Sequence, residues 1–143
     1  MGTVSILLML AMTASPESIR SHDIVGIWEA ESGNYQVEIY QEAGAYAGKL
    51  IWLEENLDYE GKPIRDWLNP NEKLKGQKVE GSVCLIDLRY VGEGTYGQGK
   101  VYDFLSGRHY QARIELLGRN RAKLRGFIAM PILGRSEYFR RVE

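Results

Sequence analysis

Alternation of apolar and polar residues with a period of two constrains this chain more than any other feature of its sequence. A period of two sends successive side chains to opposite faces of a strand. Eight segments with this pattern follow one another along the chain. They are 24–31, 34–42, 46–53, 83–90, 95–103, 108–117, 121–129 and 136–142. Such a series predicts an all-β fold.

Most of these segments are joined by short connections that contain turn-forming residues. The connections "ESGN", "EAGA", "LSGR" and "LGRN" each supply glycine or asparagine. Short links favour an antiparallel up-and-down meander. Closing eight strands into a barrel removes both exposed edges, so an eight-stranded barrel is the predicted fold. A two-sheet sandwich is the structural alternative.

One connection, residues 54–82, is much longer than the others. A link of this length in a compact domain is usually functional or partly structured. Asn69 stands where a helix N-cap belongs, and Pro70 suits the first helical position. We therefore expect one short helical turn that ends at Gly76.

The N-terminus differs from the rest of the chain. Val4 to Met12 is an apolar run too short to span a bilayer, and small residues follow it. This arrangement predicts a signal peptide over residues 1–18 that is cleaved near Ala14. The protein is then expected to be periplasmic or secreted, with no stable membrane insertion. Residues 23–143 are expected to form a single domain.

Charge is unevenly distributed along the chain. Residues 23–99 contain 14 acidic and 7 basic residues, whereas residues 100–143 contain 10 basic and 4 acidic ones. The basic residues alternate with apolar ones, as in "RAKLRGF". This places them on a solvated strand face, where they complement acidic neighbouring strands. Nucleic acid is therefore not an expected partner.

A Gly-x-Trp motif opens the first predicted strand, at Gly26 and Trp28, and arginines end the last one. This pairing resembles the calycin signature of lipocalins and their relatives. The resemblance implies that a terminal arginine packs across the indole and closes one end of the barrel, with Gly26 allowing close backbone approach. Arg141 is the expected partner of Trp28, and the adjacent Arg140 is the alternative.

The chain also resembles the bacterial family called domain of unknown function 2147. The fragments that carry the resemblance are "GIW", "YAGKLIWL", "GKPIRDWLNPN", "GKVYDFLSGRHYQARIEL", "LRGFI" and "LGRSEYFRRV". The resemblance implies an exported protein with a calycin-like barrel, and it implies no biochemical role.

Catalytic chemistry has little support in the sequence. His22 precedes the first strand, His109 lies on a predicted outward face, and neither belongs to a catalytic constellation. No zinc spacing or phosphate-binding glycine loop is present, so no metal or cofactor is expected. Asp66 and Asp103 are the remaining acid–base pair, but each is better explained as a turn cap.

Binding of a small molecule has more support. Four amphipathic aromatic residues are predicted to point into the barrel, namely Tyr35, Trp52, Tyr102 and Tyr110. Asp66, Trp67 and Asn69 are the candidates at the mouth, although all seven residues could instead fill the core or organise the loop. The predicted function is non-enzymatic binding of a small, largely apolar molecule in the barrel. The first alternative is an envelope protein-interaction module that docks through residues 54–82, and an enzyme is the second.

Overall fold

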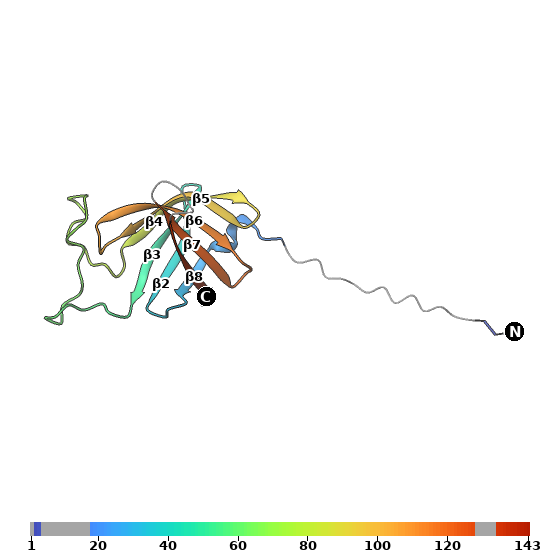
Figure 1. The fold of residues 1–143 in the computed structure, drawn as a ribbon, viewed down its shortest axis with the longest axis horizontal. Helices are drawn as coiled ribbons and strands as arrows, with labels where there is room; N and C mark the ends of the chain where they lie inside the picture. The colour runs from blue at the N-terminus through green and yellow to red at the C-terminus, as the bar shows by residue number, and fades with distance from the viewer. Residues whose placement is uncertain (1, 4–17, 128–133) are drawn as a thin grey trace.

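The computed structural model describes residues 2–3, 18–127 and 134–143. Eight antiparallel strands form a closed barrel and follow one another around it in chain order (Figure 1). The strands are β1 Gly26–Ala30, β2 Tyr35–Glu42, β3 Ala45–Leu53, β4 Val83–Gly92, β5 Thr95–Asp103, β6 Arg108–Leu116, β7 Arg121–Phe127 and β8 Arg135–Arg141. The predicted up-and-down barrel is confirmed. The predicted signal peptide lies almost wholly outside the described residues.

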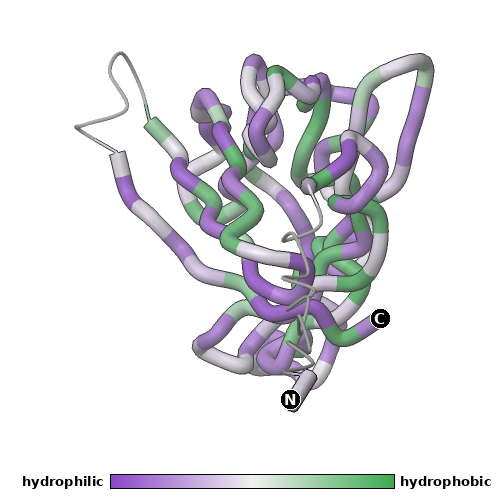
Figure 2. Tube along the Cα trace, turned by 90° about the vertical axis from the view of Figure 1, so that its right-hand side faces the viewer, coloured by the Kyte–Doolittle hydropathy of each residue, from purple (hydrophilic) through white to green (hydrophobic). Residues whose placement is uncertain are grey.

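Pairing between the first and last strands closes the barrel. Trp28 pairs with Arg141 and Ala30 with Phe139, both in antiparallel register. Every strand is thereby bonded to two neighbours, which excludes the two-sheet sandwich. Figure 2 shows hydrophobic and hydrophilic residues alternating along the strands. In the part of the chain that the structure describes, no helix has the length and apolar character needed to cross a membrane.

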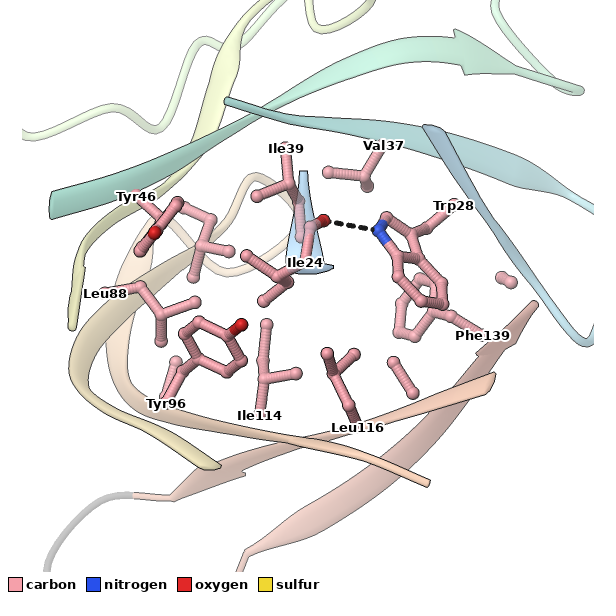
Figure 3. Close-up of a cluster of buried hydrophobic side chains, with 14 of the residues drawn as sticks. Ile24, Trp28, Val37, Ile39, Tyr46, Leu88, Tyr96, Ile114, Leu116 and Phe139 are labelled. Carbon is pink, nitrogen blue, oxygen red and sulfur yellow. Dashed lines mark hydrogen bonds between the residues drawn. The ribbon is translucent and has the colours of Figure 1, made fainter. Parts of the chain in front are cut away.

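A short 3₁₀ helix, η1 (Ser21–Ile24), plugs one end of the barrel. We refer to this as the closed end. The sequence predicted a linker here and a strand from residue 24, but β1 begins only at Gly26. Ile24 is 0% exposed and lies at the centre of a ring of buried side chains that includes Leu88 and Tyr96 (Figure 3). This packed cluster is the core.

Bulges in β3 and β4 interrupt the alternation of side chains between the two faces of the strand. Gln36 pairs with Trp52 and Val37 pairs with Leu50, so Ile51 is an extra residue in β3. A bulge of this kind turns the next side chain to the opposite face. Trp52 consequently points outward and is 39% exposed, so the inward prediction for it was wrong.

The second shift occurs in β4. Asp87 has a positive φ of 58°, and two β4 residues face a single residue of β3 at this point. Strict alternation would put Ile86 on the same face as Leu88, but Leu85 and Leu88 face the core and Ile86 is 36% exposed. A left-handed residue interrupts the pleat, which is why strict alternation fails here.

The long connection between β3 and β4 projects from the other end of the barrel, at the left of Figure 1. We call this the open end. No helix forms in the connection; instead, the N–H groups of Leu74 and Lys75 both donate to the carbonyl of Asn71, giving one hydrogen-bonded turn. Gly76 ends this turn with a φ of 83°. The turn thus ends where predicted but begins at Asn71.

Candidate functional site

An arginine seals the closed end. The guanidinium carbon of Arg141 lies 4.3 Å from the centre of the Trp28 ring. Its Nη1 donates to the carbonyl of Val25 and its Nε to that of Arg119, each at 2.8 Å, and its Nη2 donates to that of Asp23. Burial lowers the pKa of Arg141 from its ordinary value. One side chain therefore stacks on the indole and joins three chain segments.

The neighbouring residues explain why the contact with the indole is made by Arg141 and requires a glycine at position 26. A Cβ on Gly26 would lie 2.5 Å from Nη1 of Arg141, so no larger residue fits without a shift. Arg140 points outward and pairs with Glu29 at 3.1 Å. Trp28 donates its indole N–H to the carbonyl of Ile24 at 2.8 Å (Figure 3). Arg141, and not Arg140, is thus the residue against the indole.

At the open end, an acidic residue lies on the inner face of the barrel. The Tyr35 hydroxyl donates to the Glu137 carboxylate, and the Tyr35 ring packs edge-on against Phe139 with ring centres 5.7 Å apart. Burial, together with this hydrogen bond, raises the pKa of Tyr35 above its usual range. Glu137 was not among the site residues predicted from the sequence. Its alternation with Phe139 and Arg141 was the available signal.

The wall around this pair is apolar and only partly buried. Leu53, Val101 and Leu124 pack against the core and retain part of their exposure. A pocket of about 210 Å³ lies between the end of β3 and the long connection, with Leu53 and Ile64 in its lining. Glu80 also lines it and accepts hydrogen bonds from the backbone of Leu53 and from the Asn56 amide. The rim of the open end thus has a pocket of mixed apolar and polar lining beneath the long connection.

Two tyrosines predicted to point inward differ in orientation. Tyr110 shares the inner face with Ala112, and its Cβ lies 4.0 Å from the position a Cβ would take on Gly126. Tyr102 pairs with His109, one residue out of step, so it faces outward at the rim. The inward prediction for Tyr102 was wrong, because β5 bulges at Gln98, which has a φ of 61°, and the residues beyond the bulge change face.

The loop residues Asp66 and Asn69 are buried together with the Tyr102 hydroxyl. Tyr102 donates to Oδ1 of Asp66 at 2.8 Å, and the Asn69 amide donates to Oδ2 at 2.9 Å. Burial and the Asp66 carboxylate raise the pKa of Tyr102 to about 12. Trp67 lies on the outside of the loop with 64% of its surface exposed. The seven predicted binding residues therefore do not converge on one pocket.

The outer wall carries paired charges along the seam of the barrel. Arg121 lies 2.9 Å from Glu31, and Arg140 lies 3.1 Å from Glu29. These pairs join the basic C-terminal strands to the acidic N-terminal ones, as the charge distribution predicted. A groove of about 370 Å³ on the outer wall of β4, β5 and β6 has Ile86, Lys100, His109 and Gln111 in its lining.

Comparison with known proteins agrees with this architecture. The profile of a bacterial family described as "Uncharacterized protein conserved in bacteria (DUF2147)" matches residues 26–141. The chain belongs to the DUF2147 family. The match begins at the glycine and ends at the arginine that form the seal.

Protein HP1028 from the human pathogen Helicobacter pylori, described as a member of the lipocalin family, is a structural relative of this DUF2147 protein. The two share 26% sequence identity with a TM-score of 0.69, over 83% of this chain and 82% of HP1028. No curated protein matches the chain. The lipocalin-like fold is therefore established independently of the sequence motifs.

Two titratable residues of this DUF2147 protein, Asp103 and Cys84, have structural explanations. Asp103 accepts hydrogen bonds from the Leu105 N–H and the Ser106 hydroxyl, which caps the β5–β6 turn. Burial raises the pKa of Cys84 to about 12, so its thiol is protonated at neutral pH. Over the described ranges, no three His, Cys, Asp or Glu side chains are grouped so that they could hold a metal ion.

Proposed function

We propose that this protein is a non-enzymatic, lipocalin-like carrier that binds a small, largely apolar molecule in the open half of its barrel. The observation that carries the proposal is the hydroxyl–carboxylate pair Tyr35–Glu137, in which half-buried Tyr35 donates to exposed Glu137 beside partly buried apolar side chains. Ligand sites combine an apolar lining with a few oriented polar groups in this way. The likeness to HP1028, a lipocalin-family protein, supports the same function.

The position of the pair indicates how the ligand lies. The apolar body contacts Leu53, Val101 and Leu124, while a hydrogen-bond donor on the ligand faces the Glu137 carboxylate. The packed core below leaves the ligand at the mouth and not at the barrel centre. The proposed binding site is therefore shallower than the barrel interior that the sequence alone suggested.

Export is part of the proposal. The apolar run Val4 to Met12, followed by small residues, supports a signal peptide and a periplasmic or secreted protein. A single cysteine is compatible with such a compartment, where the fold simply has no disulfide to reinforce it.

Uptake of N-phenylnaphthylamine, an uncharged apolar fluorophore, tests the binding proposal. Gly126 lies on the inner face, opposite Ala112, and a Cβ there would make only ordinary contacts, the nearest at 3.6 Å. Gly126→Leu should therefore fold and fill the mouth, lowering fluorophore affinity by at least about tenfold. The matched control is Gly97→Leu, which adds the same side chain opposite Arg89, on the outer wall.

Equal uptake by the two variants would show that the fluorophore binds elsewhere, which contradicts the proposal. Native mass spectrometry of the protein purified from its own envelope then identifies the ligand. A co-purified amphiphile that is present with Gly97→Leu and absent with Gly126→Leu is the expected result.

A further inference from the structure

Large apolar side chains are exposed to solvent at the rim of the open end. Trp67 is 64%, Leu68 57% and Leu105 76% exposed, and we call these three residues the rim patch. They come from two segments that touch: a Cβ on Gly107, in the turn that carries Leu105, would lie 2.9 Å from Cβ of Leu68. Adjacent exposed apolar residues of this size usually mark an interaction surface.

The rim patch is held in place by buried polar groups. Asp66, directly before Trp67, is 2% exposed and accepts hydrogen bonds from Tyr102 and Asn69. Asn69 in turn accepts one from the backbone of Asn71 at 2.8 Å. The Trp67 ring lies across Gly76, where a Cβ would come within 2.8 Å of it. Burying a carboxylate costs free energy unless it is hydrogen-bonded. The buried and hydrogen-bonded Asp66 carboxylate fixes a segment whose large side chains remain exposed.

Positive charge surrounds the rim patch. In residues 65–78 the exposed charged residues are Arg65, Lys73, Lys75 and Lys78 on the basic side and Glu72 on the acidic side. Residues 54–61 of the same connection contain Glu54, Glu55, Asp58 and Glu60 and no basic residue. Lys62 is the one basic residue of the connection outside residues 65–78, and it pairs with Glu60 at 3.1 Å. Most of the basic charge therefore lies in the part of the connection that carries Trp67 and Leu68.

We propose that the rim patch docks the open end of the barrel onto an anionic phospholipid surface. Tryptophan prefers the headgroup level of a bilayer, leucine inserts just below it, and lysine and arginine contact anionic headgroups. A protein partner fits less well, because protein–protein interfaces are depleted in lysine, which here supplies three of the four basic residues. Docking places the mouth of the barrel against the lipid.

The proposal concerns the outside of the loop, so it stands whether or not the barrel carries a ligand. An apolar segment such as Val4 to Met12 partitions into vesicles by itself, so the measurement must be local to the rim. Tryptophan quenching by brominated lipid meets this need, since the quencher acts only at close range and Trp28 is 1% exposed.

Two variants each retain one exposed tryptophan. Trp52→Phe keeps Trp67 at the rim, and Trp67→Phe keeps Trp52 on the outer wall of β3. With vesicles of brominated phosphatidylglycerol, Trp52→Phe fluorescence should fall by about half or more, while that of Trp67→Phe should change by less than about a tenth. Three changes should each reduce the quenching. They are added salt, vesicles made of brominated phosphatidylcholine, and the double charge reversal Lys73→Glu and Lys75→Glu.

Equal quenching of the two variants would overturn the proposal, because the rim would not be the part in contact with lipid. Equal quenching by phosphatidylcholine would overturn the choice of an anionic surface. Absence of quenching, combined with an envelope protein that the unmodified chain captures and Trp67→Phe does not, would assign the rim patch to a protein partner instead.

Discussion

The two ends of this barrel are made by the same eight strands but are filled in opposite ways. At the closed end Ile24 and Leu88 are 0% exposed and Trp28 is 1% exposed, and a terminal arginine covers the indole. At the open end the interior side chains of Tyr35 and Leu124 are only partly buried. The closed end is therefore tightly packed, and the loosely packed open end is where we propose that the ligand binds.

Strand length explains part of this difference. β1 has five residues, whereas β4 has ten. Because β1 ends at Ala30, β2 and β8 have no strand between them near the mouth, and Tyr35 and Glu137 meet directly there. The short first strand therefore completes the closed end and leaves the open end without a continuous wall.

Trp28→Ala is the substitution with the largest expected effect. Truncating a buried aromatic residue removes its transfer free energy and leaves a cavity, which should cost about 3–5 kcal/mol of unfolding free energy. Urea unfolding measures this, and Trp52→Ala on the outer wall should cost less than about 1 kcal/mol. Similar losses for both would mean that the closed end is not the main source of stability.

Arg141→Lys should have the next largest effect. Lysine keeps the charge but lacks the planar group that stacks on Trp28 and reaches three carbonyls, so we expect a loss of roughly 2–3 kcal/mol. The matched control, Arg140→Lys, alters a surface pair and should stay within about 0.5 kcal/mol. Equal effects of these adjacent substitutions in urea unfolding would contradict the assignment of the seal to Arg141.

The sequence predicted the barrel well because strand pairing follows from a local pattern. In residues 108–117 the alternation puts Ala112, Ile114 and Leu116 on one face, and the structure buries all three. Alternation failed at Trp52 and Ile86 because bulges at Ile51 and Asp87 change the face partway along a strand. Whether a strand bulges depends on how the sheet curves into a barrel, and that is a tertiary property.

The candidate site was less predictable because its contacts are long-range. Tyr102 and Asp66 are 36 positions apart, and no local signal joins them. The packing of Ile24 depends on closure of the whole barrel, so "SHDI" gave no indication of a plug. Glu137 is different: reading alternation backwards from Arg141 would have placed it inside.

Tyr102→Phe probes the open end with a smaller expected effect. Removing the hydroxyl leaves the buried Asp66 carboxylate with one donor fewer, which should cost about 1–2 kcal/mol. The cost should appear as local opening of the loop, because the core does not involve this bond. Amide hydrogen exchange at Asp66 and Gly76, whose N–H groups close the loop, should therefore accelerate while Leu88 is unaffected. Uniform acceleration would mean that the two ends unfold as one unit.

Chemical labelling of Cys84 measures how readily the open end of the barrel opens, and it needs no substitution at that end. Burial raises the thiol pKa from 9.0 to about 12. At pH 8 the folded protein should therefore contain about a thousandfold less thiolate than the unfolded chain, and should react with iodoacetamide correspondingly slowly. The unfolded thiol loses its proton near pH 9, so this group lowers the stability as pH rises from 9 towards 12.

The decisive measurement is labelling of Cys84 in the Trp28→Ala background. Cys84 is the second residue of β4, which begins at the open end. If this end opens locally, the labelling rate at pH 8 depends on local opening and should not change when the closed end is destabilised. A rate that instead rises in proportion to the lost stability would mean that Cys84 is reached only by global unfolding. The open end would then be as firmly held as the closed end, and the contrast between the two ends would be wrong.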